Sequence, residues 1–212
     1  MFIFSFMFLP LLITSFCLYY KSQKVVPVIT IGLVSAILVS AFQAFFTFAH
    51  RVIHYSFSGN YVYLLFRQAL LPVVILFLIF FFVSKDTLQF KIEMFLPLEL
   101  SFYAIFLPYT IITTSEGLFS WYALFFKPVL FGSMLIFSAI AINYAYKFIS
   151  AKKLVLGIIV IIAGLCYCFI PAVFETFYLL KLYTGFVIFG GLVYILLPVL
   201  LIVLKFLKII KL

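Results

Sequence analysis

The sequence predicts an all-α integral membrane protein, a polytopic bundle of about seven transmembrane helices (six to eight) forming one domain over residues 1–212. The chain is 68% hydrophobic and only 9% charged, and its mean hydropathy is +1.40. The charged residues lie mainly in short connections between long apolar runs. A water-soluble domain of this size exposes more charge, so an integral membrane protein is the class that fits.

The first four spans follow from apolar runs of the ~20 residues that a bilayer crossing needs. The run at 2–20 has neither a basic start nor a small-residue cleavage site, so we expect a retained helix rather than a signal peptide. Further spans are expected at 26–48, 62–83 and 93–114, each bounded by charged residues.

The second half predicts three more spans, at 129–146, 154–175 and 184–204. The segment before them, 116–128, holds Trp121 and Tyr122 and ends at Pro128. Because Trp and Tyr favour the headgroup level of a bilayer, we predict a short helix lying in the interface. The alternative is an N-terminal extension of the fifth span, bent at Pro128.

The basic residues predict the orientation, since Lys and Arg are enriched in cytoplasmic connections. Alternate connections place most of them on one side, and this side is predicted to be cytoplasmic, with the N-terminus outside and the C-terminus inside. A bacterial cytoplasmic membrane is the expected location. The cytoplasmic set is Lys21, Lys24, Lys85, Lys91, Lys147, Lys152, Lys153, Lys205, Lys208 and Lys211, and the outer set is Arg51, Arg67, Lys127 and Lys181.

Small residues recur every four positions in the second span, at Gly32, Ala36, Ser40 and Ala44. Residues four apart share one face of a helix, and small side chains there let another helix approach closely. We expect this face to be a helix-packing surface.

The fourth span carries a polar stripe of Glu99, Tyr103 and Thr110. A charge near mid-bilayer costs about 2.5–3.5 kcal/mol on insertion scales, so the stripe should face the bundle interior. Pairing with Arg67 is disfavoured, because the hairpin geometry leaves the two residues about 15 Å apart in helix rise. We expect Glu99 to be neutral and hydrogen-bonded to Ser, Tyr or Asn on other helices, or to face water. Its role is either proton coupling or ligand binding, or a structural hydrogen bond.

Prolines at 72, 97 and 108 predict irregularities in the third and fourth spans. Each proline lacks an N–H and frees the carbonyl four residues earlier. In lipid such a carbonyl needs another partner, so these positions should face other helices or a cavity.

Polar residues concentrate toward the predicted outer half of the bundle. An outward-facing cavity with cationic and acidic groups is one interpretation, and an ordinary headgroup-facing rim is the other. The residues are Gln43, Thr47, His50, His54, Arg67, Gln68, Thr110, Thr113, Thr114, Glu116 and Glu175.

The sequence favours neither a metal site nor an enzyme. His50 and His54 have metal-ligand spacing, but Arg51 stands where a metalloprotease motif has glutamate and would repel a cation. The nucleophile, Walker and dinucleotide-binding motifs are missing. We therefore expect no cofactor and no metal.

The expected function is a small transporter, or a transmembrane subunit of a transport system, that binds a small solute or proton in a polar interior. The alternative is a non-catalytic structural or assembly subunit of a larger membrane complex, and the third possibility is an intramembrane enzyme acting on lipid. The expected partners are the lipid bilayer and other membrane subunits or an energy-coupling partner, with a small-molecule solute. The net charge of +9 does not indicate nucleic acid, because it is dispersed between apolar runs.

Overall fold

The computed structural model describes residues 25–49, 56–83, 93–113 and 120–206, and these residues form helices and no strand. Five of the described helices are long and apolar enough to cross a bilayer. Together with the composition, this indicates an integral membrane protein. The helices are α2 (Val25–Ala49), α3 (Phe57–Leu64), η1 (Leu65–Leu70), α4 (Leu71–Val83), α6 (Phe95–Thr113), η2 (Tyr122–Phe126), α7 (Lys127–Ser150), α8 (Leu154–Leu179) and α9 (Tyr183–Phe206).

The predicted spans in the described part of the chain coincide with helices, with differences at their ends. The span predicted at 62–83 begins earlier, at Phe57, because Ser56 caps it: the Ser56 hydroxyl accepts a hydrogen bond from the Gly59 backbone N–H at 3.2 Å. The span predicted at 154–175 continues to Leu179. The predicted span 2–20 lies outside the described residues, so the count of seven and the orientation stay predictions.

The segment predicted as a short interfacial helix continues into α7. From Trp121 the chain is helical without interruption to Ser150. Residues 121–128 therefore form an N-terminal extension of the fifth span, which was the alternative, and not a separate short helix. Trp121 is exposed, yet its ring contacts those of Tyr178 and Phe186 at centroid distances of 6.2 and 5.8 Å. Residues 116–119 lie outside the described part of the chain.

Two π-helical turns, η1 and η2, each end two residues before a proline, Pro72 and Pro128. The proline ring clashes with the carbonyl four residues earlier in an α-helix, and a wider turn relieves that clash. In both turns the capping N–H reaches back five residues, from Leu71 to the Phe66 carbonyl and from Lys127 to the Tyr122 carbonyl.

The π turn η1 leaves backbone carbonyls for side chains of other helices. The Leu71 N–H is bonded to Phe66, and Pro72 has no N–H to give to the next carbonyl. The Arg67 carbonyl accepts from Gln43 Nε2 at 3.1 Å, and the Gln68 carbonyl accepts from the Tyr103 hydroxyl at 2.9 Å. The expectation that a proline-freed carbonyl faces another helix is thus met at Pro72.

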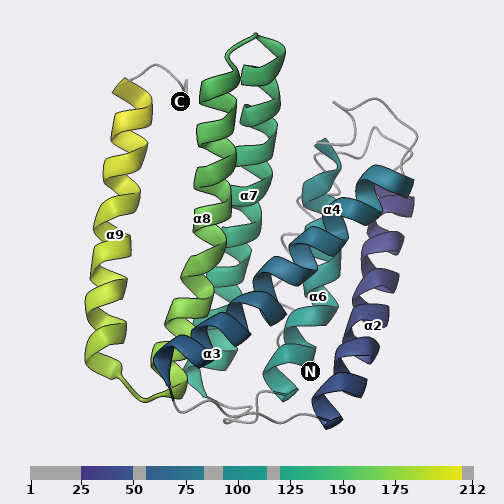
Figure 1. The fold of residues 1–212 in the computed structure, drawn as a ribbon, viewed down its shortest axis with the longest axis vertical. Coiled ribbons are helices and arrows are strands. Elements are labelled where there is room, and N and C mark those ends of the chain that lie inside the picture. Colours follow the sequence, from purple (N-terminus) through teal and green to yellow (C-terminus); the bar gives the residue numbers. More distant parts are fainter. Residues whose placement is uncertain (1–24, 50–55, 84–92, 114–119, 207–212) are drawn as a thin grey trace.

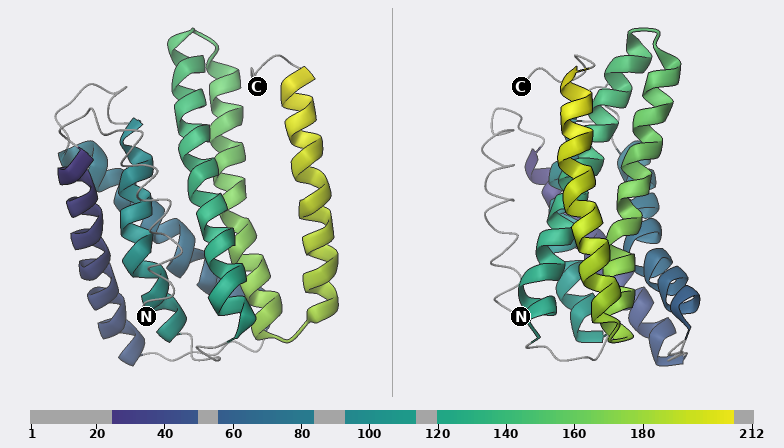
Figure 2. Two further views of the ribbon diagram at one scale, coloured as in Figure 1. Left: turned by 180° about the vertical axis from the view of Figure 1, so that it is seen from behind. Right: turned by 90° about the vertical axis from the view of Figure 1, so that its left-hand side faces the viewer.

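The helices pack as two pairs joined by an oblique helix. One pair is α2 with α6 and the other is α7 with α8, while α9 packs against α8. The continuous helix α3–η1–α4 crosses at an angle to the others (Figure 1) and contacts α8 through α3 and η1, and α6 and α2 through α4. The other two views show the same arrangement, with α9 at the far side of α7 and α8 from α2 (Figure 2).

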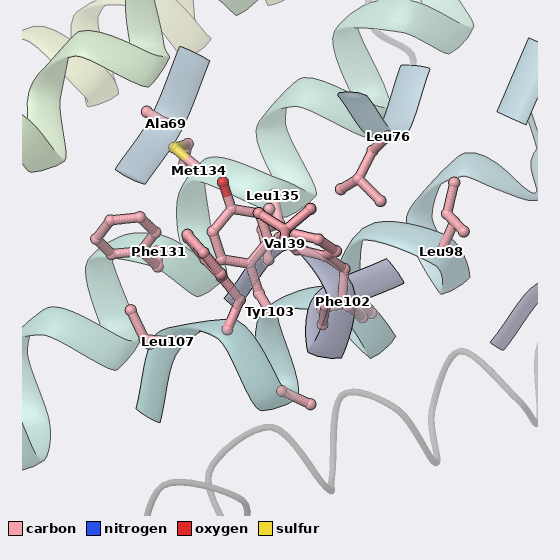
Figure 3. Packing of buried hydrophobic residues seen from close by; sticks show 14 of the residues in the cluster. Val39, Ala69, Leu76, Leu98, Phe102, Tyr103, Leu107, Phe131, Met134 and Leu135 are labelled. Carbon is pink, nitrogen blue, oxygen red and sulfur yellow. The ribbon is translucent and has the colours of Figure 1, made fainter. Parts of the chain in front are cut away.

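The core centres on α6, whose side chains are mostly buried. Tyr103 and Phe102 lie there with Phe131, Leu135 and Val39 from neighbouring helices (Figure 3). The Tyr103 ring meets the Phe131 ring at a centroid distance of 5.7 Å. This packing surrounds the polar hydroxyl of Tyr103 with apolar and aromatic side chains.

The packing surface predicted on α2 faces α6 closely at Gly32. A Cβ added there would overlap the Ser101 hydroxyl and lie 2.8 Å from the backbone oxygen of Leu98. Ala36 and Ser40 on the same face are buried. Ala44 is half-buried.

We predict that Gly32→Ala lowers the free energy of unfolding by about 1–3 kcal/mol, because the Leu98 carbonyl cannot move away as a flexible side chain would. Gly191→Ala is the matched control, since in the described part of the chain an added Cβ there meets nothing within 4 Å. Thermal unfolding in detergent, followed by Trp121 fluorescence, measures both. Equal midpoints for Gly32→Ala and the parent would contradict the close α2–α6 packing.

Candidate functional site

A lysine and a glutamate form an ion pair inside the bundle. Lys127 Nζ lies 2.7 Å from Glu175 Oε1, and the two side chains are only 2% and 3% exposed. Gln68 Nε2 donates a hydrogen bond to the same carboxylate oxygen at 3.1 Å. The Glu175 cluster is the name used below for four residues: Glu175, Lys127, Gln68 and Tyr122.

The local backbone explains why three different helices meet at this pair. Gln68 belongs to η1, and Lys127 follows η2 directly. Glu175 lies on α8 four residues, or about 6 Å of rise, before Leu179 at the helix end. Both π turns therefore point polar side chains at one position, and π turns are frequent at functional sites.

Tyr122 lines a small cavity beside the ion pair. Its ring stacks on Tyr178 at 4.3 Å with an interplanar angle of 11°, which fixes the ring's position. The cavity has a volume of about 20 Å³. It is lined by Ile111, Ser120, Tyr122, Ala123, Lys127, Glu175, Tyr178 and Leu179.

Three polar atoms of the Glu175 cluster have no hydrogen-bond partner among the described residues. They are the second carboxylate oxygen of Glu175, the amide oxygen of Gln68 and the hydroxyl of Tyr122. A buried polar atom without a partner costs about 1–3 kcal/mol. Two other buried hydroxyls of the described residues, those of Ser40 and Tyr109, also lack a partner. The Glu175 cluster holds three of the five such atoms, so hydrogen-bonding capacity is concentrated there.

Arg67 organises a second group next to the first. Its guanidinium donates to the Thr113 hydroxyl at 2.8 Å, to the Tyr63 hydroxyl at 3.0 Å and to Gln43 Oε1 at 3.4 Å. Arg67 directly precedes Gln68 in η1, and Gln68 bonds to Glu175. Two cations and the Glu175 carboxylate therefore share one region of the bundle.

Glu99 meets Ser138 of α7 and is fully buried. The Ser138 hydroxyl lies 3.1 and 3.0 Å from the two carboxyl oxygens, and 2.9 Å from the backbone oxygen of Leu135. One hydroxyl hydrogen cannot serve three acceptors well. A proton on Glu99 would let one carboxyl oxygen donate to Ser138 while Ser138 donates to the Leu135 carbonyl, so that the single hydroxyl hydrogen has one acceptor.

Tyr103 connects the two carboxyl sites. It lies one helical turn from Glu99 on α6, and its hydroxyl donates to the backbone oxygen of Gln68. Gln68 in turn donates to Glu175. A line of polar groups thus runs from the Glu175 cluster through Gln68 and Tyr103 toward Glu99.

The residues predicted for the site fall into several groups. Glu175 belongs to the Glu175 cluster, and Tyr103 bonds to the backbone of Gln68 in it. Arg67 and Gln43 form the neighbouring group, whereas Glu99 bonds to Ser138. Thr110 donates to its own helix at the Leu107 carbonyl, at 2.8 Å. His50 and His54 lie outside the described residues. Within the described part of the chain there is no group of three or more His, Cys, Asp or Glu side chains that could hold a metal.

Sequence reasoning missed two central partners, Lys127 and Ser138. Lys127 was counted among the charges of a connection, whereas it is buried at the start of α7. The available signal was its position after the apolar run YALFF and before Pro128. Ser138 gave no signal, since serines are common in such helices.

No protein family model, curated protein or solved structure matches the chain.

We predict that Lys127→Met destabilises the protein by about 3–5 kcal/mol, because it leaves a buried carboxylate without its counter-charge. Lys181→Met is the control, since Lys181 is exposed near the same end of the bundle. Thermal unfolding in lipid nanodiscs compares the two variants. Similar midpoints for both would contradict a buried ion pair.

We predict that Ser138→Ala lowers the free energy of unfolding by about 1–3 kcal/mol, because the buried carboxyl oxygens of Glu99 then lose their hydrogen bond to Ser138. Replacing both partners, as Ser138→Ala with Glu99→Leu, should return most of this loss. A double-mutant cycle of thermal unfolding measures the coupling. Additive effects would show that the two side chains do not interact.

Proposed function

We propose that the protein is a small membrane transporter, or the transmembrane subunit of a transport system, in which the Lys127–Glu175 ion pair couples transport to proton binding. The observation that carries the proposal is this buried pair with an unpartnered carboxylate oxygen beside a cavity. Ionisable residues within transmembrane segments are costly and typically mark ion or proton pathways.

The energetics support a functional rather than a purely stabilising role. Removing two charges from water costs several kcal/mol per ion, and a well-packed apolar pair of similar volume is often as stable or more so. The pair is therefore weak as a stabilising device. A functional role is different: if the pair breaks when Glu175 takes up a proton, η1, α7 and α8 can adopt two arrangements, one with the pair formed and one with it broken.

The line of polar groups supports proton coupling in particular. Glu175, Gln68 and Tyr103 are linked by hydrogen bonds, and Glu99 lies one turn further on. Proton relays in pumps and transporters use such buried carboxyl groups. The cavity of about 20 Å³ is far too small for a drug-sized solute, which needs roughly 300 Å³ or more.

We place the Glu175 cluster toward the outer side of a bacterial cytoplasmic membrane. The opposite end of the bundle holds the connection between α7 and α8, with Lys152 and Lys153 exposed. Basic connections favour the cytoplasm.

The second candidate is a non-catalytic subunit of a larger membrane assembly. It is favoured by Gly191, which is exposed on α9 and has nothing within 4 Å of an added Cβ in the described part of the chain. Exposed glycines let a partner helix approach closely. The exposed apolar side chains of α9, such as Val187 and Ile188, would suit such a partner as well as lipid.

Proton flux into vesicles tests the proposal. The protein, with any polypeptide that native mass spectrometry finds bound to it at fixed ratio, is reconstituted with trapped pyranine under a valinomycin-imposed potassium potential. We expect flux above protein-free vesicles for the parent and for Lys181→Met. Glu175→Gln should reduce the flux to the protein-free level, because it removes the titratable carboxyl while keeping the side chain's shape.

Glu99→Gln in the same assay separates the two carboxyl groups. Parent-like flux for Glu99→Gln with loss for Glu175→Gln assigns coupling to Glu175. The reverse result would move coupling to Glu99, and parent-like flux for both would exclude both carboxyl groups as the coupling group. A parent flux no higher than that of protein-free vesicles would contradict the proposal and leave the assembly role. Folding of each variant is checked by its thermal midpoint.

A further inference from the structure

We infer that the cavity between η2 and α8 is a binding site for one water molecule. This water joins Glu175 to the aqueous phase at the end of the bundle where η2 begins and α8 ends. The inference rests on the proposed function, since it names how a proton would reach the pair. It adds a ligand and the direction from which that ligand enters.

The cavity has the size and the polar groups that a single water needs. A water requires a cavity of roughly 10–15 Å³ and two to four polar partners, and this cavity measures about 20 Å³. The Glu175 Oε2 atom can accept, and the Tyr122 hydroxyl can both donate and accept. Both atoms are unpartnered among the described residues, and both side chains are at least 97% buried.

Ser120 supplies a third partner at the rim. Its oxygen accepts from the Ala123 backbone N–H at 3.2 Å, which leaves the hydroxyl hydrogen available. Ser120, Tyr178 and Leu179 line the cavity and are half-buried. The cavity therefore reaches from the buried ion pair to residues that lie at the helix ends.

The charges around the cavity favour a neutral donor over a metal cation. Lys127 lies against Glu175 from α7 and lines the cavity, and Arg67 stands next to Gln68 in η1. These two cations repel another cation, whereas the free carboxylate oxygen still needs a hydrogen-bond donor. Water meets both conditions. The Gln68 amide and the Tyr178 ring complete the surroundings.

Glu99 differs from Glu175 in this respect. Its oxygens meet Ser138, and its side chain is fully buried away from the cavity lining. Of these two carboxyl groups, Glu175 is therefore the one beside the inferred water.

Hydroxyl-radical footprinting of the protein in nanodiscs tests the site. Radicals generated from a bound water oxidise the residue beside it, even where that residue is buried. Tyr122 and Tyr103 form a matched comparison, since they are 2% and 0% exposed and Tyr103 has a protein acceptor. We expect several-fold faster oxidation of Tyr122 than of Tyr103, measured by mass spectrometry.

A pair of alanine variants separates a bound water from local opening of the helix. Ala123→Val fills the cavity and should bring the oxidation of Tyr122 down to the level of Tyr103. Ala139→Val, a buried alanine on α7 outside the cavity lining, should leave it unchanged.

Equal oxidation of the two tyrosines in the parent protein would overturn the inference without any variant. Fast oxidation of Tyr122 that persists in a folded Ala123→Val protein would overturn it as well. The water site and the proposed function fail separately: fast labelling with no proton flux would leave a structural water.

Discussion

The ion pair between Lys127 and Glu175 is the interaction on which the interior depends. Lipid offers no hydrogen bonds, so each polar group inside the bundle must find its partner in the protein. One carboxylate oxygen of Glu175 on α8 finds two partners, Lys127 and Gln68, while the other has none among the described residues. The pair therefore links α8 to α7, and Gln68 links the same carboxylate to the oblique helix. Arg67, the neighbour of Gln68, and Tyr103, which bonds to the Gln68 carbonyl, extend this set of contacts.

Prolines give the same bundle its other polar contacts. Pro72 and Pro128 each follow a widened turn, and the first of these turns exposes the Arg67 and Gln68 carbonyls to Gln43 and Tyr103. A backbone irregularity that would be costly in lipid thus becomes a point of attachment between helices. At η1, the backbone carbonyls of Arg67 and Gln68 and the side chains of the same two residues therefore belong to one hydrogen-bond network.

Much of the architecture follows from the sequence, and much of the site does not. Apolar length and charge spacing predicted the helices within the described residues, because bilayer thickness fixes span length. The small face at Gly32 was also evident, since helical spacing puts it on one side. Arg67 bonds to Gln43, Tyr63 and Thr113, and Glu99 bonds to a serine on another helix.

The partners themselves depend on tertiary geometry that spacing cannot supply. Lys127 and Glu175 are 48 residues apart, and Lys127 directly follows the π turn η2, which a 3.6-residue period does not reveal. Lys127 looked like a connection charge because basic residues usually are. The helix that holds Lys127 begins at Trp121 and continues through η2 into α7, and this places Lys127 within a helix rather than in a connection.

The π turn η1 has a consequence for how the chain can change. It adds one residue to a helical repeat, so it shifts the phase of everything after it by about 100° relative to a regular α-helix. The part before η1 packs on α8, and the part after it packs on α6 and α2. Deleting one residue here would keep the helix but turn α4 away from its neighbours, so the length of this stretch is constrained as well as its side chains.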